Sequence, residues 1–114
     1  MSTEGSQVTA AETAPHPTRR VDEFLREVLA KGGSDLHFVA GDPPRIRVYG
    51  ELQTLREELL GQDFVRDALA EIMPRQATVR LEEKDGADFA YSIPGVSRFR
   101  VNVFRKDSGV GAVF

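Results

Sequence analysis

The residues best suited to chemistry are two arginines, Arg98 and Arg100, which alternate with apolar residues in one short segment. If residues 97–104 form a strand, successive side chains point to opposite faces, so both guanidinium groups and Asn102 share one face while the apolar side chains bury on the other. No acidic residue occurs within residues 89–106. Two forked cations on a rigid strand, with no carboxylate nearby in sequence, are suited to a bidentate oxyanion such as a phosphate or a partner's carboxylate.

A second interpretation of these arginines stays open. Surface charge is the usual fate of Arg, so Arg98 and Arg100 also fit a solvated outer sheet face on which they pair with acids from elsewhere in the chain. Asp35 and His37 lie two residues apart in another candidate strand, so they would share a face and could together contact a partner. A lone histidine in a strand more often has a structural role.

Several kinds of catalytic and metal site are excluded by what the chain lacks. It contains no cysteine and only two histidines, His16 and His37, so a zinc site is not expected. The sequence has no Gly-x-x-x-x-Gly-Lys-Ser/Thr phosphate loop, and the glycines of residues 107–111 are interpreted as a hairpin turn. No serine stands in a nucleophile context, so the chain is not expected to hydrolyse a substrate unaided.

The composition indicates one mildly acidic domain. The chain has 114 residues, with 15 basic and 18 acidic side chains and a net charge of −3. This length supports a single core, and the acidic balance argues against non-specific binding to nucleic acid, which depends on neutralising phosphates. The sequence has no run of about 18 apolar residues and no signal-peptide pattern, so we expect an intracellular protein that does not insert into a membrane.

The elements that must position these side chains follow from the spacing of apolar residues. Residues 1–19 are predicted to form a disordered tail and residues 20–114 the folded domain. Helical spacing predicts helices over residues 21–29, 62–73 and about 74–84, the last of them burying Ala77, Val79 and Leu81. Alternation predicts strands over residues 35–40, 45–49, 52–55, 88–93, 97–104 and from 110 onward. This order predicts an α+β fold, an antiparallel sheet of about five to six strands covered by three helices.

The last residues of the chain, 110–114, are apolar and strand-like, with no turn or polar tail after them. Natural termini are usually polar and frayed. The sequence is therefore expected to be a fragment of a longer protein whose chemistry lies downstream.

Five runs of sequence have counterparts in one protein family. They read GSDLH from residue 33, AGDPPRIRVYG from residue 40, DFAYSIPG from residue 88, RFRVNVF from residue 98 and GVGAVF from residue 109. Together, in this order and at this spacing over about residues 20–114, they resemble the start of the type IV pilus retraction ATPases (PilT-like, in the type II/IV secretion ATPase superfamily). Each run alone is a weak signal, and their combination is quite specific.

The resemblance implies a PAS-like N-terminal domain, followed by a RecA-like ATPase domain that carries the motifs for ATP and Mg. It implies ring hexamers in the cytoplasm, at the inner-membrane platform of the pilus machine, where ATP turnover shortens the pilus and drives twitching motility. Each N-terminal domain would pack on a neighbouring ATPase domain and offer Arg100 foremost, and also Arg98, to the nucleotide's phosphates. Asp35, His37 and Arg105 are expected at an interface. The fragment alone is expected to be inactive and to hold no cofactor or metal.

Two other hypotheses remain. One is a paralogue with the same domain: an accessory retraction ATPase, or a pilus assembly or type II secretion ATPase. The runs SDLH and PPRIRV favour the retraction branch. The other is a free-standing PAS-like module that binds a small ligand or a protein partner, against which the uncapped apolar end of the chain argues.

Overall fold

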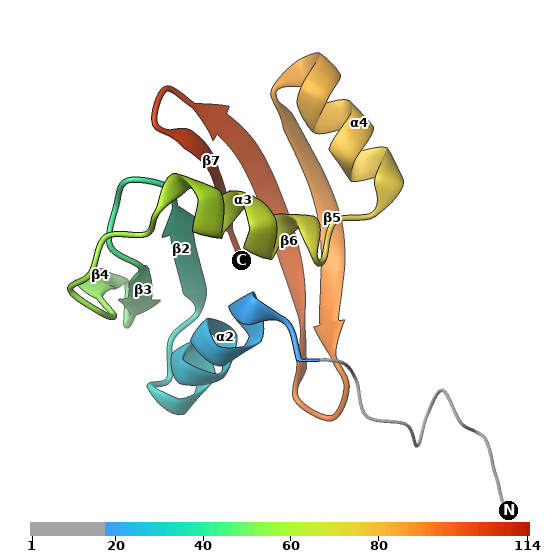
Figure 1. Ribbon diagram of the computed structural model, residues 1–114. Helices are drawn as coiled ribbons and strands as arrows, with labels where there is room; N and C mark the ends of the chain where they lie inside the picture. Colours follow the sequence, from blue (N-terminus) through green and yellow to red (C-terminus); the bar gives the residue numbers. More distant parts are fainter. Residues whose placement is uncertain (1–17) are drawn as a thin grey trace, which may run out of the picture.

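The computed structural model describes residues 18–114, which form an antiparallel sheet with helices packed against it (Figure 1). This range contains three helices and six strands, so the predicted α+β class is confirmed. The helices are α2 (Arg20–Ala30), α3 (Gln62–Ala70) and α4 (Arg75–Lys84). The strands are β2 (Asp35–Val39), β3 (Arg45–Val48), β4 (Glu51–Thr54), β5 (Gly86–Ile93), β6 (Ser97–Lys106) and β7 (Gly109–Val113). The predicted tail, residues 1–19, lies outside the described residues except for Thr18 and Arg19.

The strand order β4-β3-β2-β7-β6-β5 places β7 in the middle of the sheet. Ala112 of β7 lies opposite Phe38 of β2 on one side and opposite Val103 of β6 on the other. Beyond β7, the backbone of Phe114 exchanges two hydrogen bonds with Leu36, at 2.9 and 3.1 Å. β7 therefore joins the N-terminal strands and the C-terminal hairpin into one sheet.

The core lies between the sheet and the two helices α2 and α3, which cross the same face (Figure 1). The apolar stripe predicted for α2 is confirmed at Val21, Leu25 and Val28, which are at most 2% exposed, but not at Leu29, which is 39% exposed. Phe24 of α2 meets Phe38 of β2 edge to face, with ring centroids 5.2 Å apart. Burial of these aliphatic and aromatic side chains docks α2 onto the strands beside β7.

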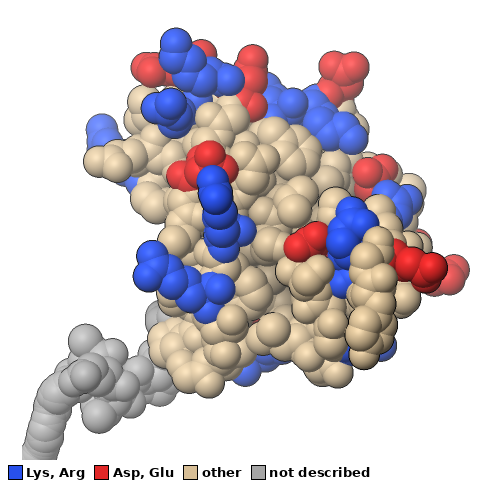
Figure 2. All heavy atoms as spheres, turned by 180° about the vertical axis from the view of Figure 1, so that it is seen from behind, with Lys and Arg blue, Asp and Glu red and all other residues tan. Residues whose placement is uncertain are grey.

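The opposite face of the sheet carries no helix within the described residues, and it is the side seen in Figure 2. The pattern of β6 follows from this difference between the faces. Val101 and Val103 point to the helices and are fully buried, whereas Arg98, Arg100 and Asn102 are exposed. The predicted alternation along this strand is therefore confirmed. Figure 2 shows Lys and Arg side chains on the open face together with Asp and Glu side chains, with broad areas of uncharged surface between the charged groups.

Helix α4 packs beside the edge strand β5 (Figure 1). It follows Pro74, whose missing N–H is tolerated at a helix start, and it ends at Asp85 in the left-handed conformation, with φ of 62°. Ala77 and Leu81, four residues apart, are its buried positions. Val79 was expected to bury with them but is 41% exposed. A helix at the edge of a sheet contacts it through a narrow stripe, and a residue two positions along the helix points away from that stripe.

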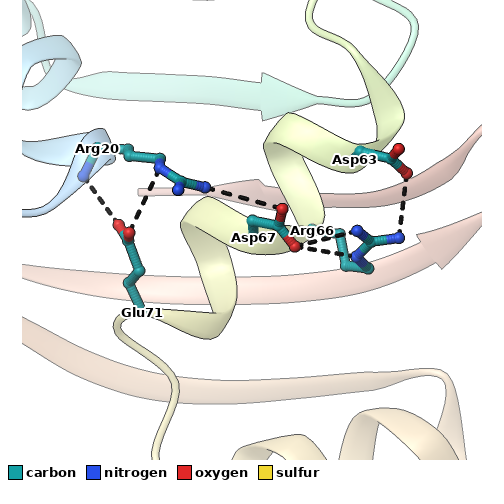
Figure 3. A network of polar contacts seen from close by, with 5 residues as sticks. All are labelled: Arg20, Asp63, Arg66, Asp67 and Glu71. Atoms are coloured by element: carbon teal, nitrogen blue, oxygen red, sulfur yellow. Dashed lines mark hydrogen bonds and ion pairs between the residues drawn. The ribbon is translucent and has the colours of Figure 1, made fainter.

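An exposed network of ion pairs joins α2 to α3 (Figure 3). Arg20 at the start of α2 places Nε 3.4 Å from Glu71 Oε2, and its backbone N–H donates to Glu71 Oε1 at 3.0 Å. Arg66 pairs with Asp63 at 3.0 Å and with Asp67 at 3.1 Å. Because exposed pairs contribute only about 0–1 kcal/mol each, this network orients the helices and apolar burial holds them.

Asp22 and Tyr91 form a polar contact inside the core. Asp22, 1% exposed, accepts a hydrogen bond from the hydroxyl of Tyr91 at 2.5 Å and another from the backbone N–H of Arg19 at 3.0 Å. Burial, together with the hydrogen bond to the Asp22 carboxylate, raises the pKa of Tyr91 well above its usual value, so the hydroxyl remains a donor. The contact ties β5 to the first turn of α2.

Removing this hydroxyl should destabilise the protein. In Tyr91→Phe, the buried carboxylate of Asp22 loses one donor, and we expect the free energy of unfolding to fall by about 1–3 kcal/mol. Urea denaturation followed by circular dichroism measures it. The matched control is Tyr49→Phe, since Tyr49 is 98% exposed, and its change should stay within about 0.5 kcal/mol. Equal effects of the two substitutions would show that the buried contact adds no stability.

Candidate functional site

The open face of the sheet has a shallow depression beside the two arginines, with a volume of about 400 Å³. We name it the arginine hollow. Its lining residues are Ser34, Asp35, Arg98, Phe99, Arg100, Asn102, Val113 and Phe114. The hollow thus combines two cations and an aromatic and aliphatic lining with one carboxylate from β2.

The register of the central strands places the hollow. Val113 lies opposite Asn102 of β6 and opposite His37 of β2. Arg98 and Arg100 continue along β6 past this level, and Asp35 continues along β2 in the same direction. The hollow is therefore the space that β6 and β2 border beyond Val113.

The side chains of Arg98 and Arg100 form no hydrogen bond or ion pair with any residue in the described part of the chain, although their backbones pair with β5. The acids that border them are engaged by other groups. Asp35 Oδ2 lies 3.1 Å from Arg47 Nε, and Asp88 Oδ1 accepts a hydrogen bond from Asn102 Nδ2 at 2.9 Å. The alternative in which these arginines pair with acids elsewhere in the chain is not realised within residues 18–114.

Other arginines show that pairing is common in this domain. Arg56 pairs with Glu23 and Glu27, and its guanidinium carbon lies 4.3 Å from the centre of the Phe24 ring. Hydrogen bonds to these two carboxylates raise the pKa of Arg56 further. Arg56 therefore serves the fold, whereas the guanidinium groups in the hollow are available to a ligand or a partner.

Asp35 and His37 share the open face of β2, as predicted, but only Asp35 lines the hollow. His37 lies opposite Arg45 of β3. Partial burial lowers the pKa of His37, as do the charges of Arg47 and Arg45, and the negative charge of Asp35 opposes them only in part. His37 is consequently neutral at physiological pH.

Arg105 lies away from the hollow, at the end of α4. Its Nε is 3.2 Å from Asp85 Oδ1, and its Nη2 donates to the backbone oxygen of Leu81 at 3.4 Å. A cation at this position satisfies a free carbonyl and complements the helix dipole. The fold therefore brings together Arg98, Arg100 and Asp35, and it leaves His37 and Arg105 outside the hollow.

Sequence reasoning did not identify the other residues that line or border the hollow. Ser34, Val113 and Phe114 reach it through strand pairing between distant parts of the chain. Arg47, which pairs with Asp35, could have been placed on the open face from the sequence, because side chains alternate along β3. Its partner could not be named without the register.

No group of three or more His, Cys, Asp or Glu side chains is arranged to hold a metal ion within residues 18–114. Over the same range, none of the helices has the length and apolar character needed to span a membrane.

The depressed pKa of His37 should make stability depend on pH. The unfolded state takes up a proton on His37 near the ordinary pKa of 6.5, while the folded state resists it. The stability that neutral His37 contributes is therefore complete above that pH and is lost as pH falls below it. We expect His37→Gln to flatten the decline in unfolding free energy between about pH 7.5 and 5.5. Denaturant titrations across this window test it. A His37→Gln variant that keeps the wild-type slope would contradict the prediction.

The chain is similar in sequence and in fold to known proteins. No protein-family model matches the chain. The chain is 39% identical over 94 residues to the type IV pilus retraction ATPase PilT of Pseudomonas aeruginosa, an alignment that covers 82% of this chain and 27% of that protein. It is 34% identical over 92 residues to the type IV pilus ATPase PilU of the same organism, covering 81% of this chain and 24% of PilU. The chain therefore spans about a quarter of the length of these relatives.

Solved structures show the same similarity at the level of the fold. A crystal structure of the pilus retraction motor PilT with bound ADP matches with a TM-score of 0.75 and 32% identity, covering 84% of this chain and 28% of that one. The ATPase DotB of Legionella pneumophila matches with a TM-score of 0.70 over 86% of this chain and 29% of that one, at 24% identity, which shows a shared fold alone. The chain belongs to the PilT-like type IV pilus retraction ATPases, as the counterpart of their N-terminal domain.

Proposed function

We propose that this chain is the N-terminal domain of a hexameric motor ATPase that powers type IV pilus retraction, and that Arg100, with Arg98, contacts the phosphates of a nucleotide held by a neighbouring ATPase domain. The observation that carries the proposal is the presence of two exposed arginines, side by side on the open face of β6, with no acidic partner in residues 18–114. The kinship with PilT and PilU supports the identity of the parent protein.

The arginines fit the phosphates of ATP by charge and by geometry. β6 pairs with β5 along the residues that carry them, with Arg100 opposite Ala90 and Arg98 opposite Ser92, so the backbone beneath both guanidinium groups is fixed. A guanidinium group presents donors in a rigid fork that matches phosphate oxygens. The chain contains no phosphate-binding loop of its own, so these side chains would complete a site built elsewhere.

The role of the two residues would be to stabilise negative charge. In phosphoryl transfer, charge spreads over the oxygens of the transferred group, and a positioned arginine lowers the barrier by offsetting it. ATP with Mg supplies the reacting phosphate when bound to the ATPase domain. Arg100 and Arg98 would bind its oxygens from the adjacent subunit, so turnover would require correct contact between subunits.

The remaining predicted site residues are proposed at domain or subunit interfaces. Asp35 and His37 lie on the open face, where a neighbouring domain would pack, and Arg105 lies exposed at the end of α4. In this arrangement the protein would act in the cytoplasm as a homo-hexamer, against the pilus platform at the inner membrane, without entering the membrane or binding nucleic acid.

Loss of Arg100 should impair turnover more than stability. In the full-length protein, we expect Arg100→Ala to reduce the ATPase rate at least 100-fold, because comparable arginines contribute roughly 10³–10⁵ in rate, and Arg98→Ala to reduce it less. Steady-state ATPase assays and thermal unfolding measure the two effects. Arg26→Ala is the matched control, since Arg26 is an exposed arginine of α2 outside the hollow. Wild-type turnover in Arg100→Ala would remove the phosphate-contacting role.

The chain by itself should bind ATP negligibly. Arg98 and Arg100 supply positive charge, but the sequence has no loop that surrounds phosphates. Calorimetric titration of the isolated chain with a non-hydrolysable ATP analogue is expected to show no binding in the micromolar range. A micromolar dissociation constant would instead indicate a complete nucleotide site within this domain.

A further inference from the structure

We infer that Asn102 is a positioning residue that holds Asp88 away from Arg100 and so keeps the Arg100 guanidinium group available. The inference rests on the proposed function of Arg100. It concerns how the fold maintains a free cation close to a carboxylate.

The register of β5 and β6 places Asp88 within reach of Arg100. Asp88 lies directly opposite Asn102, and Ala90 lies opposite Arg100, all on the open face. Asp88 and Arg100 are therefore diagonal neighbours across the strand pair, a separation that long side chains span. Both side chains are exposed, yet no ion pair forms between them.

The side-chain amide of Asn102 accounts for this separation. Asn102 Nδ2 donates to Asp88 Oδ1 at 2.9 Å, which directs the carboxylate across the strand pair to Asn102 and away from the diagonal. Because the amide is neutral, it fixes the position of Asp88 without adding a positive charge that would compete for a phosphate. An apolar residue here would leave Asp88 free to turn to Arg100.

The other acid that borders the arginines is restrained in a similar way. Asp35 lines the hollow, and its Oδ2 is engaged by Arg47 Nε at 3.1 Å. Arg47 is itself fixed, since its Nη1 donates to the backbone oxygen of Gly50 at 2.9 Å. Each carboxylate beside Arg98 and Arg100 thus accepts a hydrogen bond from a different side chain. The donor to Asp35 is a cation, Arg47, and the donor to Asp88 is the neutral amide of Asn102.

The test measures ATPase activity of the full-length protein in four variants. Asn102→Ala should lower the rate about two- to fivefold, the factor that competition from one exposed ion pair can produce. Asp88→Asn should have little effect, and the double variant Asn102→Ala with Asp88→Asn should recover most of the loss, because no carboxylate remains to capture Arg100. Ser92→Ala is the control: Ser92 is exposed, lies opposite Arg98 and should leave the rate unchanged.

Two further measurements separate this role from a structural one. The defect of Asn102→Ala relative to wild type should shrink as salt rises, because salt screens exposed ion pairs. A crystal structure of that variant should show Arg100 within 4 Å of Asp88. An Asn102→Ala variant with wild-type activity, or one that Asp88→Asn does not rescue, would overturn the inference while Arg100→Ala remains impaired. If Arg100→Ala itself has wild-type activity, the proposed function fails, and the crystal structure alone decides whether Asn102 restrains Asp88.

Discussion

The pairing of β7 between β2 and β6 is the constraint on which the rest of this structure depends. Ala112 is in register with Phe38 on one side and Val103 on the other, and all three are fully buried. The helices pack on the sheet that this pairing creates. The same register sets Arg100 and Asp35 around one hollow, although more than sixty residues separate them in sequence. Fold and candidate site therefore have a common origin in one strand.

The uneven coverage of the sheet determines which polar groups serve the fold and which are free. On the helix side, a polar group must be satisfied, and Asp22 is satisfied by Tyr91 and by the backbone of Arg19. On the open side, an exposed arginine remains hydrated and needs no partner, so Arg98 and Arg100 persist without one in the described range. Such cations contribute little to stability. Their presence on a rigid strand is explained better by what they can bind than by the fold.

The sequence was most informative where local periodicity decides the outcome. The α2 stripe, the alternation of β6 and the helix start after Pro74 all follow from spacing and backbone chemistry. Periodicity was misleading for Val79, because it cannot say that α4 would lie at an edge of the sheet. It was silent on the contact between Asp22 and Tyr91 and on the pairing of Asp35 with Arg47, since both depend on how distant elements meet. The arginines could be selected from sequence, but the residues around them could not.

If this domain lends charge to a site elsewhere, as proposed, it faces a specific physical problem. Its cations must stay unpaired in a chain that has more acids than bases, 18 against 15. Repulsion between the two arginines does not solve it, because the nearest carboxylates would gain by pairing with them. The cations stay unpaired if another donor competes for each of these carboxylates. Arg47 is that donor for Asp35, and Asn102 is that donor for Asp88. Beside an arginine that is proposed to bind phosphate, a neutral donor is the better choice, since it restrains the acid without becoming a second, misplaced binding site for the same anion.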